Sequence, residues 1–259
     1  MGGYGFWQQQ QHAKIISMIK QNYTIAENKL VASDTYRLVL AGKGTTDGEF
    51  VHLEIPGFYL RRPLSVCDAE HGKMMLLYKT VGEGTRALAQ LPAGTEINVL
   101  EGLGKGFDAD ACKGKALLVA GGLGAAPLYL LAKKLKAQGK KVTVVLGFNK
   151  KEEIVLEQEF KALCDSFALA TLDGSAGTKG FVTDALKALQ PEYDYFYTCG
   201  PMVMMKAVCS LLEGPGEASL EERMGCGAGF CYGCSIQTAG GPRRVCKDGP
   251  VFKKEEILW

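Results

Sequence analysis

The chain has 259 residues, of which 47% are hydrophobic and 22% are charged, so it holds enough apolar material for two folded domains and a small third segment. A formal net charge of +2 gives no reason to expect nucleic-acid or membrane binding, and no apolar run is long enough to span a bilayer. Nine cysteines, an odd number, in a chain without a secretory signal indicate a cytoplasmic protein with reduced thiols.

The first 17 residues are rich in glycine and glutamine and show no hydrophobic periodicity. Their apolar part is too short and too interrupted for a secretory signal. We expect residues 1–17 to form a disordered leader that lies outside the fold.

Residues 18–109 contain short runs of β-forming residues with glycine and proline between them. The clearest runs are residues 36–42, 50–57, 73–82 and 95–102. Many short strands separated by turn residues are typical of a small antiparallel β-barrel. We therefore expect a barrel domain over this range.

Two short motifs in the barrel region have the chemistry of a phosphate site. Arg61, Arg62 and Ser65 follow the second clear strand, and V-G-E-G-T-R comes about twenty residues later, at 81–86. An arginine can bind a pyrophosphate through two hydrogen bonds, glycine amides can approach phosphate closely, and Thr85 adds a hydroxyl at the start of a helix. Either motif alone is usually only a turn or a helix cap.

From residue 110 the pattern changes to strands that alternate with helices. Buried strands are expected at 115–122, 141–148, 167–174 and 193–200. The helix after the first strand has one apolar face and a glycine where a helix commonly ends; these residues are Leu128, Leu131, Ala132, Leu135 and Gly139. Such alternation predicts a parallel sheet with helices on both faces, over residues 110–213.

Two glycine turns in this second domain follow buried strands. One is A-G-G-L-G-A-A-P at 120–127, and the other is T-C-G-P-M at 198–202. Because ligands of parallel sheets bind at the carboxyl ends of the strands, both turns should lie at one ligand-binding edge. Pro127 fits the first position of the following helix, whose amino end attracts phosphate. A single glycine turn of this kind is often purely structural, but the pair predicts a nucleotide site.

Four cysteines close the sequence in the pattern C-x4-C-x2-C with a later fourth; they are Cys226, Cys231, Cys234 and Cys246. This spacing is typical of plant-type [2Fe–2S] ligation. Glycines interleave with the cysteines and allow backbone amides to approach the sulfur atoms. Zinc is the rival metal, although zinc ribbons favour two C-x2-C pairs and this loop has one. Residues 214–259 are too few to build a core and are expected to depend on the metal.

The remaining cysteines and the histidines show no ligand spacing. Five cysteines are scattered and have the character of buried or site-adjacent thiols; they are Cys67, Cys112, Cys164, Cys199 and Cys209. His12, His52 and His71 form no catalytic pairing, and we expect them to be surface or leader residues.

From about residue 20 onwards the chain resembles the ferredoxin–NADP reductase superfamily, and within it the electron-transfer subunit of type B dihydroorotate dehydrogenase. The resemblance is carried by RRPLSVCD, VGEGT, GGLGAAPL, TLDGSAGTKGFVTD, CGPM, ERMGCGAGFCYGC and VCKDGPVF. The last two motifs are the most specific. An α+β multidomain fold follows: an antiparallel β-barrel flavin domain (18–109), an α/β parallel-sheet nucleotide domain (110–213) and a small C-terminal [2Fe–2S] domain (214–259).

The resemblance also implies three cofactors and the residues that hold them. FAD is assigned to Arg62, Pro63, Leu64, Ser65, Leu77, Tyr78, Lys79, Gly84 and Thr85. NAD is assigned to Gly121, Gly122, Gly124, Pro127, Asp173, Cys199, Gly200, Pro201 and Met202. The metal ligands are Cys226, Cys231, Cys234 and Cys246.

Two points stay open within these assignments. Cys199 either tunes hydride transfer or is a small residue that lets nicotinamide approach the flavin, and the second interpretation is favoured. The residues do not decide between NAD and NADP, because Lys150 and Lys151 follow the second strand and no acidic residue stands at the usual distance after the glycine turn. The resemblance favours NAD.

In the family that the chain resembles, an FMN-containing catalytic subunit oxidises dihydroorotate during pyrimidine synthesis. Electrons then pass through the [2Fe–2S] cluster and FAD to NAD+, in a heterotetramer. No general base for dihydroorotate is visible here, as expected if that step belongs to the partner. The alternatives are the small subunit of an NADP-dependent ferredoxin oxidoreductase or sulfide dehydrogenase, and a non-catalytic redox sensor, which would leave two nucleotide motifs without a role.

Overall fold

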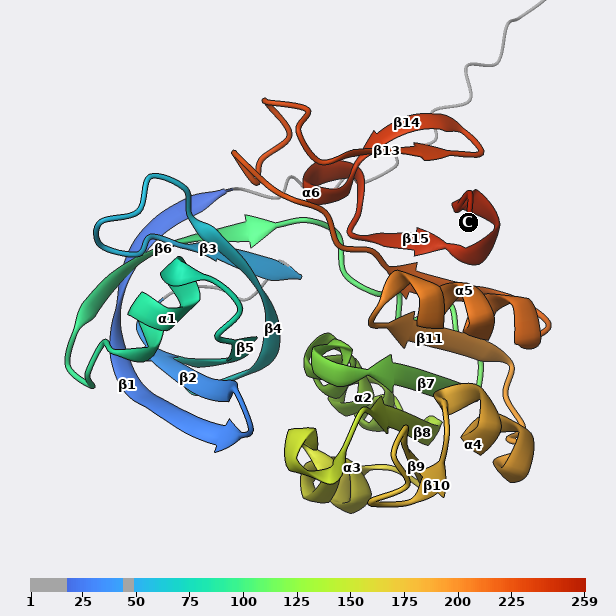
Figure 1. Cartoon of the computed structure of the whole chain (residues 1–259). Coiled ribbons are helices and arrows are strands. Elements are labelled where there is room, and N and C mark those ends of the chain that lie inside the picture. Colours follow the sequence, from blue (N-terminus) through green and yellow to red (C-terminus); the bar gives the residue numbers. More distant parts are fainter. Residues whose placement is uncertain (1–17, 44–48) are drawn as a thin grey trace, which may run out of the picture.

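The computed structural model describes residues 18–43 and 49–259, so the predicted leader at 1–17 lies outside the described residues. A barrel, a sheet covered by helices and a cysteine-bearing segment are visible in Figure 1. The predicted α+β multidomain architecture is confirmed. No helix in the described part of the chain is long and apolar enough to cross a membrane.

The barrel is closed by six antiparallel strands in the order β1-β2-β5-β4-β3-β6. Their bounds are Ile19–Ala32 (β1), Thr35–Ala41 (β2), Phe50–Leu53 (β3), Arg62–Glu70 (β4), Lys73–Lys79 (β5) and Glu96–Leu103 (β6), and helix α1 spans Glu83–Ala89. Aliphatic side chains fill the interior, and Leu38, Leu53 and Val99 are fully buried. The sequence pattern did not single out β1 or β4, because both mix polar and apolar residues without the clear alternation of a half-buried strand.

The second sheet has seven strands in the order β10-β9-β8-β7-β11-β12-β15, and only β15 runs antiparallel to its neighbour. The strands are Lys115–Gly121 (β7), Lys141–Phe148 (β8), Ser166–Thr171 (β9), Thr178–Lys179 (β10), Tyr195–Cys199 (β11), Gly216–Ser219 (β12) and Val251–Lys253 (β15). The helices are Ala125–Ala137 (α2), Glu157–Leu163 (α3), Val182–Leu189 (α4) and Met202–Leu211 (α5). In Figure 1 the carboxyl ends of β7 and β11 point towards the barrel.

Helix α2 buries the predicted apolar face, and Gly139 follows its end with a φ of +74°. The expected position of Pro127 is wrong, however. The glycine turn winds as a 3-10 turn over Gly122–Gly124, so α2 begins at Ala125 and Pro127 occupies the third helical position. Proline is still tolerated there, because the amides of the first turn have no partner within the helix.

The C-terminal segment combines a hairpin, β13 (Ser235–Thr238) and β14 (Gly241–Arg244), with the short helix α6 (Val245–Asp248). Strands β12 and β15 belong to the large sheet, so that sheet continues beyond the expected boundary at residue 214. One buried apolar cluster joins all three parts; it contains Phe50, Leu103, Met205, Ala218, Leu220, Cys234, Val245, Cys246, Phe252 and Ile257. The segment therefore shares a core with its neighbours, and the domain limits given above remain a proposal.

The barrel and the nucleotide domain are held together by polar contacts on two sides. Lys133 of α2 pairs with Asp68 of β4 at 2.8 Å. Lys79 at the end of β5 pairs with Glu153, which follows β8, at 3.2 Å. The strand that carries the predicted flavin motif is therefore fixed against the first helix of the nucleotide domain.

Candidate functional site

A cavity of about 320 Å³ opens between the start of β4 and the start of α1, lined by Phe58, Arg62 and residues 81–85. The Arg62 guanidinium lies over the Phe58 ring, 5.2 Å from its centroid. It also lies against Gly84, where a Cβ atom would come within 2.5 Å of Arg62 Nε. Any side chain at position 84 would therefore displace the arginine from the cavity.

The turn before α1 is held by the Thr85 hydroxyl. Thr85 Oγ1 accepts a hydrogen bond from the Gly82 amide at 3.1 Å and donates one to the Gly82 carbonyl at 3.0 Å. A cationic side chain and the amino end of α1 thus face one cavity, which suits the negative charge of a pyrophosphate. The predicted phosphate residues Arg62, Gly84 and Thr85 are brought together.

The other residues assigned to FAD fall into two groups. Pro63, Leu64 and Ser65 continue along β4, and all three are half-buried. The structure turns Tyr78 into the barrel, where its hydroxyl donates to Asn28 Oδ1 at 2.8 Å. Leu77 is buried in the core and the Lys79 ammonium pairs with Glu153, so these side chains have partners within the protein.

Arg61 differs from its neighbour Arg62 in that it does not line the cavity formed by Phe58, Arg62 and residues 81–85. Its guanidinium pairs with Glu54 and donates to Asn98 Oδ1 at 2.6 Å. It also donates to the His52 carbonyl at 3.3 Å. Arg61 therefore ties neighbouring barrel strands together, and the sequence pattern alone could not separate the roles of the two arginines.

The two glycine turns meet at the carboxyl ends of β7 and β11, which are adjacent parallel strands. A Cβ atom at Gly124 would lie 2.1 Å from the Cys199 carbonyl oxygen. A Cβ atom at Gly200, whose φ is +150°, would lie 2.9 Å from the Gly121 amide nitrogen. The turns therefore pack backbone against backbone, as expected for a nucleotide-binding edge.

Cys199 lies at this junction and is half-buried. Burial, followed by the negative charge of Glu49, raises the pKa of the Cys199 thiol to about 12. Glu49 itself is buried at the start of β3, and burial raises the pKa of its carboxyl to about 8. At neutral pH Cys199 is therefore an uncharged, small side chain.

The loops after β8 and β9 are joined to each other at the same edge of the sheet. The Asp173 carboxylate accepts hydrogen bonds from the Ser175 amide at 2.9 Å and the Ser175 hydroxyl at 2.6 Å, and these bonds lower its pKa. The Lys151 amide donates to Ser175 Oγ at 2.8 Å. Asp173 is thus an ordered, exposed anion beside the nucleotide edge.

The cysteine loop folds its backbone amides around sulfur. Cys226 Sγ accepts from the amides of Ala228 (3.5 Å), Phe230 (3.3 Å) and Cys231 (3.4 Å). Burial acts to raise the pKa of the Cys226 thiol, but these amides outweigh it and bring the pKa down to about 6. An amide-lined thiolate is the environment that a cluster ligand needs.

The four thiols come as two pairs. Cys226 is hydrogen-bonded to Cys231, and Cys246 is hydrogen-bonded to Cys234. Two irons take two thiolates each, so the arrangement fits a [2Fe–2S] cluster. Over residues 18–43 and 49–259, no three His, Cys, Asp or Glu side chains converge on a single metal position.

Arg244 holds this loop in shape, a role that the sequence analysis missed. Its guanidinium donates to the Gly229 carbonyl at 2.9 Å and pairs with Asp248 at 3.0 Å. It also lies over the Tyr232 ring, 4.9 Å from the centroid. The only sequence signal is the four-residue spacing of Arg244 and Asp248, which is too common to be diagnostic.

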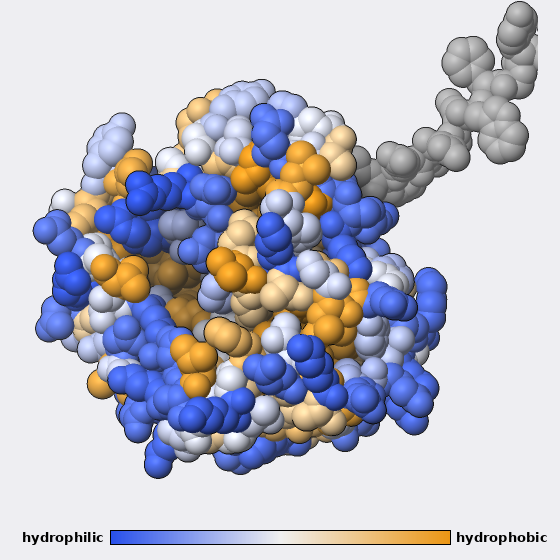
Figure 2. All heavy atoms as spheres, turned by 45° about the vertical axis from the view of Figure 1, so that its right-hand side comes forward, coloured by the Kyte–Doolittle hydropathy of each residue, from blue (hydrophilic) through white to orange (hydrophobic). Residues whose placement is uncertain are grey.

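The loop is partly exposed and rimmed by aromatic side chains. Phe230 is 74% exposed and Tyr232 is 65% exposed. Figure 2 shows several groups of apolar side chains on one face of the molecule, with hydrophilic side chains around them. Exposed apolar groups beside a cluster suit a docking surface for another protein.

The expectation that His52 is a surface residue is wrong. Its side chain is fully buried, and burial lowers its pKa to about 4. The error arose because the alternation of β3 is hidden: all four of its residues are buried. His71 is exposed as expected, and His12 lies outside the described residues.

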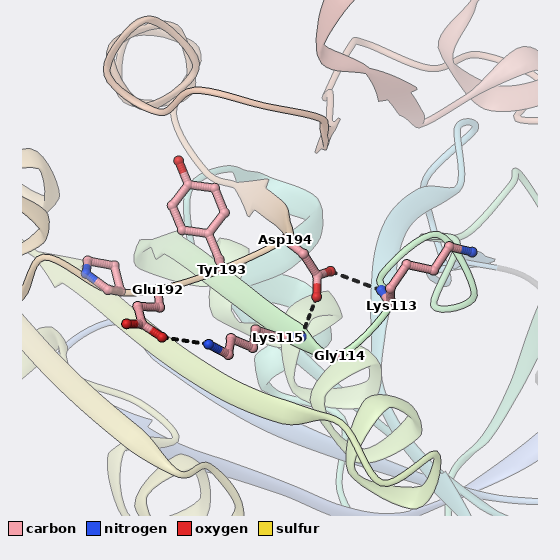
Figure 3. Close-up of a pocket in the computed structure, with 7 residues that line it drawn as sticks. Lys113, Gly114, Lys115, Glu192, Tyr193 and Asp194 are labelled. Carbon is pink, nitrogen blue, oxygen red and sulfur yellow. Dashed lines mark hydrogen bonds and ion pairs between the residues drawn. The ribbon is translucent and has the colours of Figure 1, made fainter.

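A larger hollow of about 650 Å³ lies at the opposite edge of the sheet, where β7 and β11 begin (Figure 3). The Asp194 carboxylate accepts there from the amides of Lys113 at 2.9 Å and Lys115 at 2.7 Å. The polar groups that line this hollow thus bind one another at the amino ends of the strands. Since ligands of such sheets bind at the carboxyl ends, we assign this hollow no role in the chemistry.

The barrel, the nucleotide sheet and the cysteine segment define an oxidoreductase of the ferredoxin reductase-like superfamily that uses FAD, NAD and an iron–sulfur cluster. Residues 118–210 match the oxidoreductase NAD-binding domain, and residues 221–258 match the iron–sulfur cluster binding domain of dihydroorotate dehydrogenase B.

Curated relatives identify the family more closely. The electron transfer subunit of dihydroorotate dehydrogenase B (NAD+) from Fusobacterium nucleatum is 40% identical over 254 residues, covering 92% of this chain and 98% of the relative. That from Lysinibacillus sphaericus is 42% identical over 256 residues, covering 93% and 99%. The chain belongs to the family of electron transfer subunits of dihydroorotate dehydrogenase B.

Solved structures agree on the fold. A chain of an NADH-dependent reduced ferredoxin–NADP oxidoreductase, studied for flavin-based electron bifurcation, superposes with a TM-score of 0.84 at 33% identity, covering 92% of this chain and 90% of that one. A cytochrome P450 reductase from Amycolatopsis superposes with a TM-score of 0.65 at 23% identity. The second likeness concerns the fold alone.

Proposed function

We propose that this chain carries electrons to NAD+ from a catalytic subunit that oxidises dihydroorotate. Residues of this chain would hold each of the cofactors along that route. The cluster would be held by Cys226, Cys231, Cys234 and Cys246. The FAD pyrophosphate would be held by Arg62, Gly84 and Thr85, and the flavin by residues 63–65. NAD would bind where the turns at Gly121–Gly124 and Cys199–Met202 meet.

One observation supports this proposal above all: the flavin strand β4 is flanked by the other two sites. On one side β4 pairs with β3, and β3 contacts the cysteine loop through His52 and Gly227. On the other side β4 is bound to α2, the helix that follows the first glycine turn, through Lys133 and Asp68. The flavin segment therefore lies between the cluster loop and the nucleotide edge.

When bound, FAD exchanges one or two electrons, so it can link a one-electron cluster to two-electron transfer with NAD. The protein itself offsets the charges of the bound groups and keeps the nucleotide edge open. Arg62 and the amides of the α1 turn offset the charge of the pyrophosphate, and the amides around Cys226 offset the charge of its thiolate. Gly124 and Cys199 keep the nucleotide edge free of bulky or charged groups.

The partner in this proposal is an FMN-containing dihydroorotate dehydrogenase subunit, in a heterotetramer with two copies of each chain, in the cytoplasm and in pyrimidine synthesis. The exposed rings of Phe230 and Tyr232, beside the cluster loop, support docking on this side of the molecule.

The decisive experiment is dihydroorotate-dependent reduction of NAD+ by this chain co-purified with its catalytic subunit, compared with each subunit alone. Activity only in the complex is the expected result. A complex that holds FAD and iron but does not oxidise dihydroorotate would refute the proposal.

A second candidate is the small subunit of an NADP-dependent ferredoxin oxidoreductase. The 33% identity to a chain of the reduced ferredoxin–NADP oxidoreductase favours it, because that likeness spans nearly all of both chains. Reduction of NADP+ by reduced ferredoxin, without any response to dihydroorotate, would establish this function instead.

A further inference from the structure

His52 occupies an unusual position between the two redox modules. It lies on β3, opposite Pro63 of the flavin strand β4 and Leu100 of β6. Its side chain is fully buried. A histidine in a barrel wall is thus enclosed where the barrel meets the cysteine segment.

The imidazole ring lies directly against the cluster loop at Gly227. A Cβ atom at Gly227 would come within 2.4 Å of His52 Cε1, 2.6 Å of Nε2 and 2.7 Å of Nδ1. The backbone of Gly227 has a φ of +67°, so glycine is required there for its conformation as well as for space. The Cε1 edge of the ring therefore faces the residue that follows Cys226.

The two ring nitrogens of His52, Nδ1 and Nε2, have no hydrogen-bond partner among the residues that the structure describes. The Phe50 ring, 5.7 Å away, offers no acceptor, and Arg61 binds the backbone carbonyl of His52 and not its ring. A neutral imidazole always carries one N–H, and buried donors are almost always satisfied. The ring lies against the cluster loop at Gly227, and no described atom of that loop accepts this N–H.

We propose that His52 is a positioning residue for the cluster, whose ring N–H donates to the sulfur atoms at the Cys226 end and fixes the loop on the flavin barrel. This inference rests on the cluster ligation proposed above. One side chain thereby connects the strand next to the flavin segment with the loop that carries the first cluster ligand.

A hydrogen bond to cluster sulfur favours the more negative, reduced state and so raises the reduction potential. Loss of the donor should lower that potential. The equilibrium distribution of an electron between cluster and flavin should then shift towards the flavin by about tenfold, as expected for one lost hydrogen bond to a charged group.

The test compares matched variants of the full chain in complex with its catalytic subunit. His52→Asn and His52→Gln each keep an N–H donor near one ring nitrogen, whereas His52→Leu and His52→Met have similar shapes without a donor. His71→Phe, at an exposed histidine, is the control. The readouts are iron and acid-labile sulfide content and the cluster midpoint potential from an EPR-monitored redox titration.

The proposal expects a lower potential or lost iron in both apolar variants, and a potential near that of the wild type in at least one amide variant. Apolar variants that titrate like the wild type would overturn it, as would equal loss of the cluster in all four. Wild-type protein without iron and sulfide would instead refute the cluster, and with it the ligation on which this inference rests.

Discussion

Replacement of Gly124 by alanine tests the contact between the two glycine turns most directly. The new methyl group would lie 2.1 Å from the Cys199 carbonyl oxygen and 2.7 Å from the Gly200 amide nitrogen. Non-bonded heavy atoms pack at roughly 3.5 Å, so the turns at the ends of β7 and β11 must separate by about 1.4 Å. Both neighbours are backbone atoms at the end of β11, so no side chain can move aside.

Two effects of different size should follow. Overpacking of this kind costs about 1–3 kcal/mol, which lowers the melting temperature by about 2–10 °C in a chain of this size. Displacement of a bound reactant by about 1 Å costs on the order of 100-fold in rate. We therefore expect a modest loss of stability and a large loss in kcat/KM for NADH.

The assay is anaerobic bleaching of the bound flavin by NADH in a stopped-flow instrument, together with thermal unfolding. Gly240→Ala is the matched control, because its methyl group would lie 3.8 Å from the nearest atom, in ordinary contact. If Gly124→Ala reduced its flavin as fast as Gly240→Ala, the backbone contact between the turns would not control nucleotide binding.

Three further predictions concern the other sites. Arg62→Met should lose FAD during gel filtration, because Arg62 is a cation lining the cavity proposed for the FAD pyrophosphate, whereas the exposed Arg86→Met should keep its yellow colour. Cys226→Ser should lose its iron, measured by metal analysis, while Cys164→Ser in the nucleotide domain should retain it. Glu49 titrates near 4.5 when unfolded and near 8 when folded, so the wild type loses stability as the pH rises between these values. Glu49→Gln lacks this loss, and its advantage in melting temperature should grow from pH 5 to pH 8; a constant difference would contradict the raised pKa of Glu49.

The cysteine loop was the most predictable part of the molecule. Three of its proposed ligands, Cys226, Cys231 and Cys234, are close in sequence, so their spacing alone restricts the geometry. The same holds for the glycine turns, where a strand and the helix that follows it are joined by a few residues. In both cases local sequence determines the turn itself, whereas long-range contacts determine what packs against it.

The features that escaped prediction depend on long-range contacts. Arg61 and Arg62 are neighbours with different roles, because Asn98, far along the chain, binds only Arg61. His52 is buried because a loop that begins more than 170 residues later covers it. No sequence pattern within β3 could reveal that the cysteine loop covers His52.

The shared core has a consequence for assembly of the cluster. Cys234 and Cys246 are buried in one apolar cluster with Phe50 of the barrel and Met205 of the nucleotide domain. The segment that carries the proposed metal ligands is therefore packed by the same side chains that join the two larger parts. Because a metal site that forms only in the folded state adds its binding energy to folding, removal of the iron should loosen the contacts of the barrel with the sheet as well as the loop. The position of the cysteine loop relative to the barrel is thus set by the packing of the whole molecule and not by the loop alone.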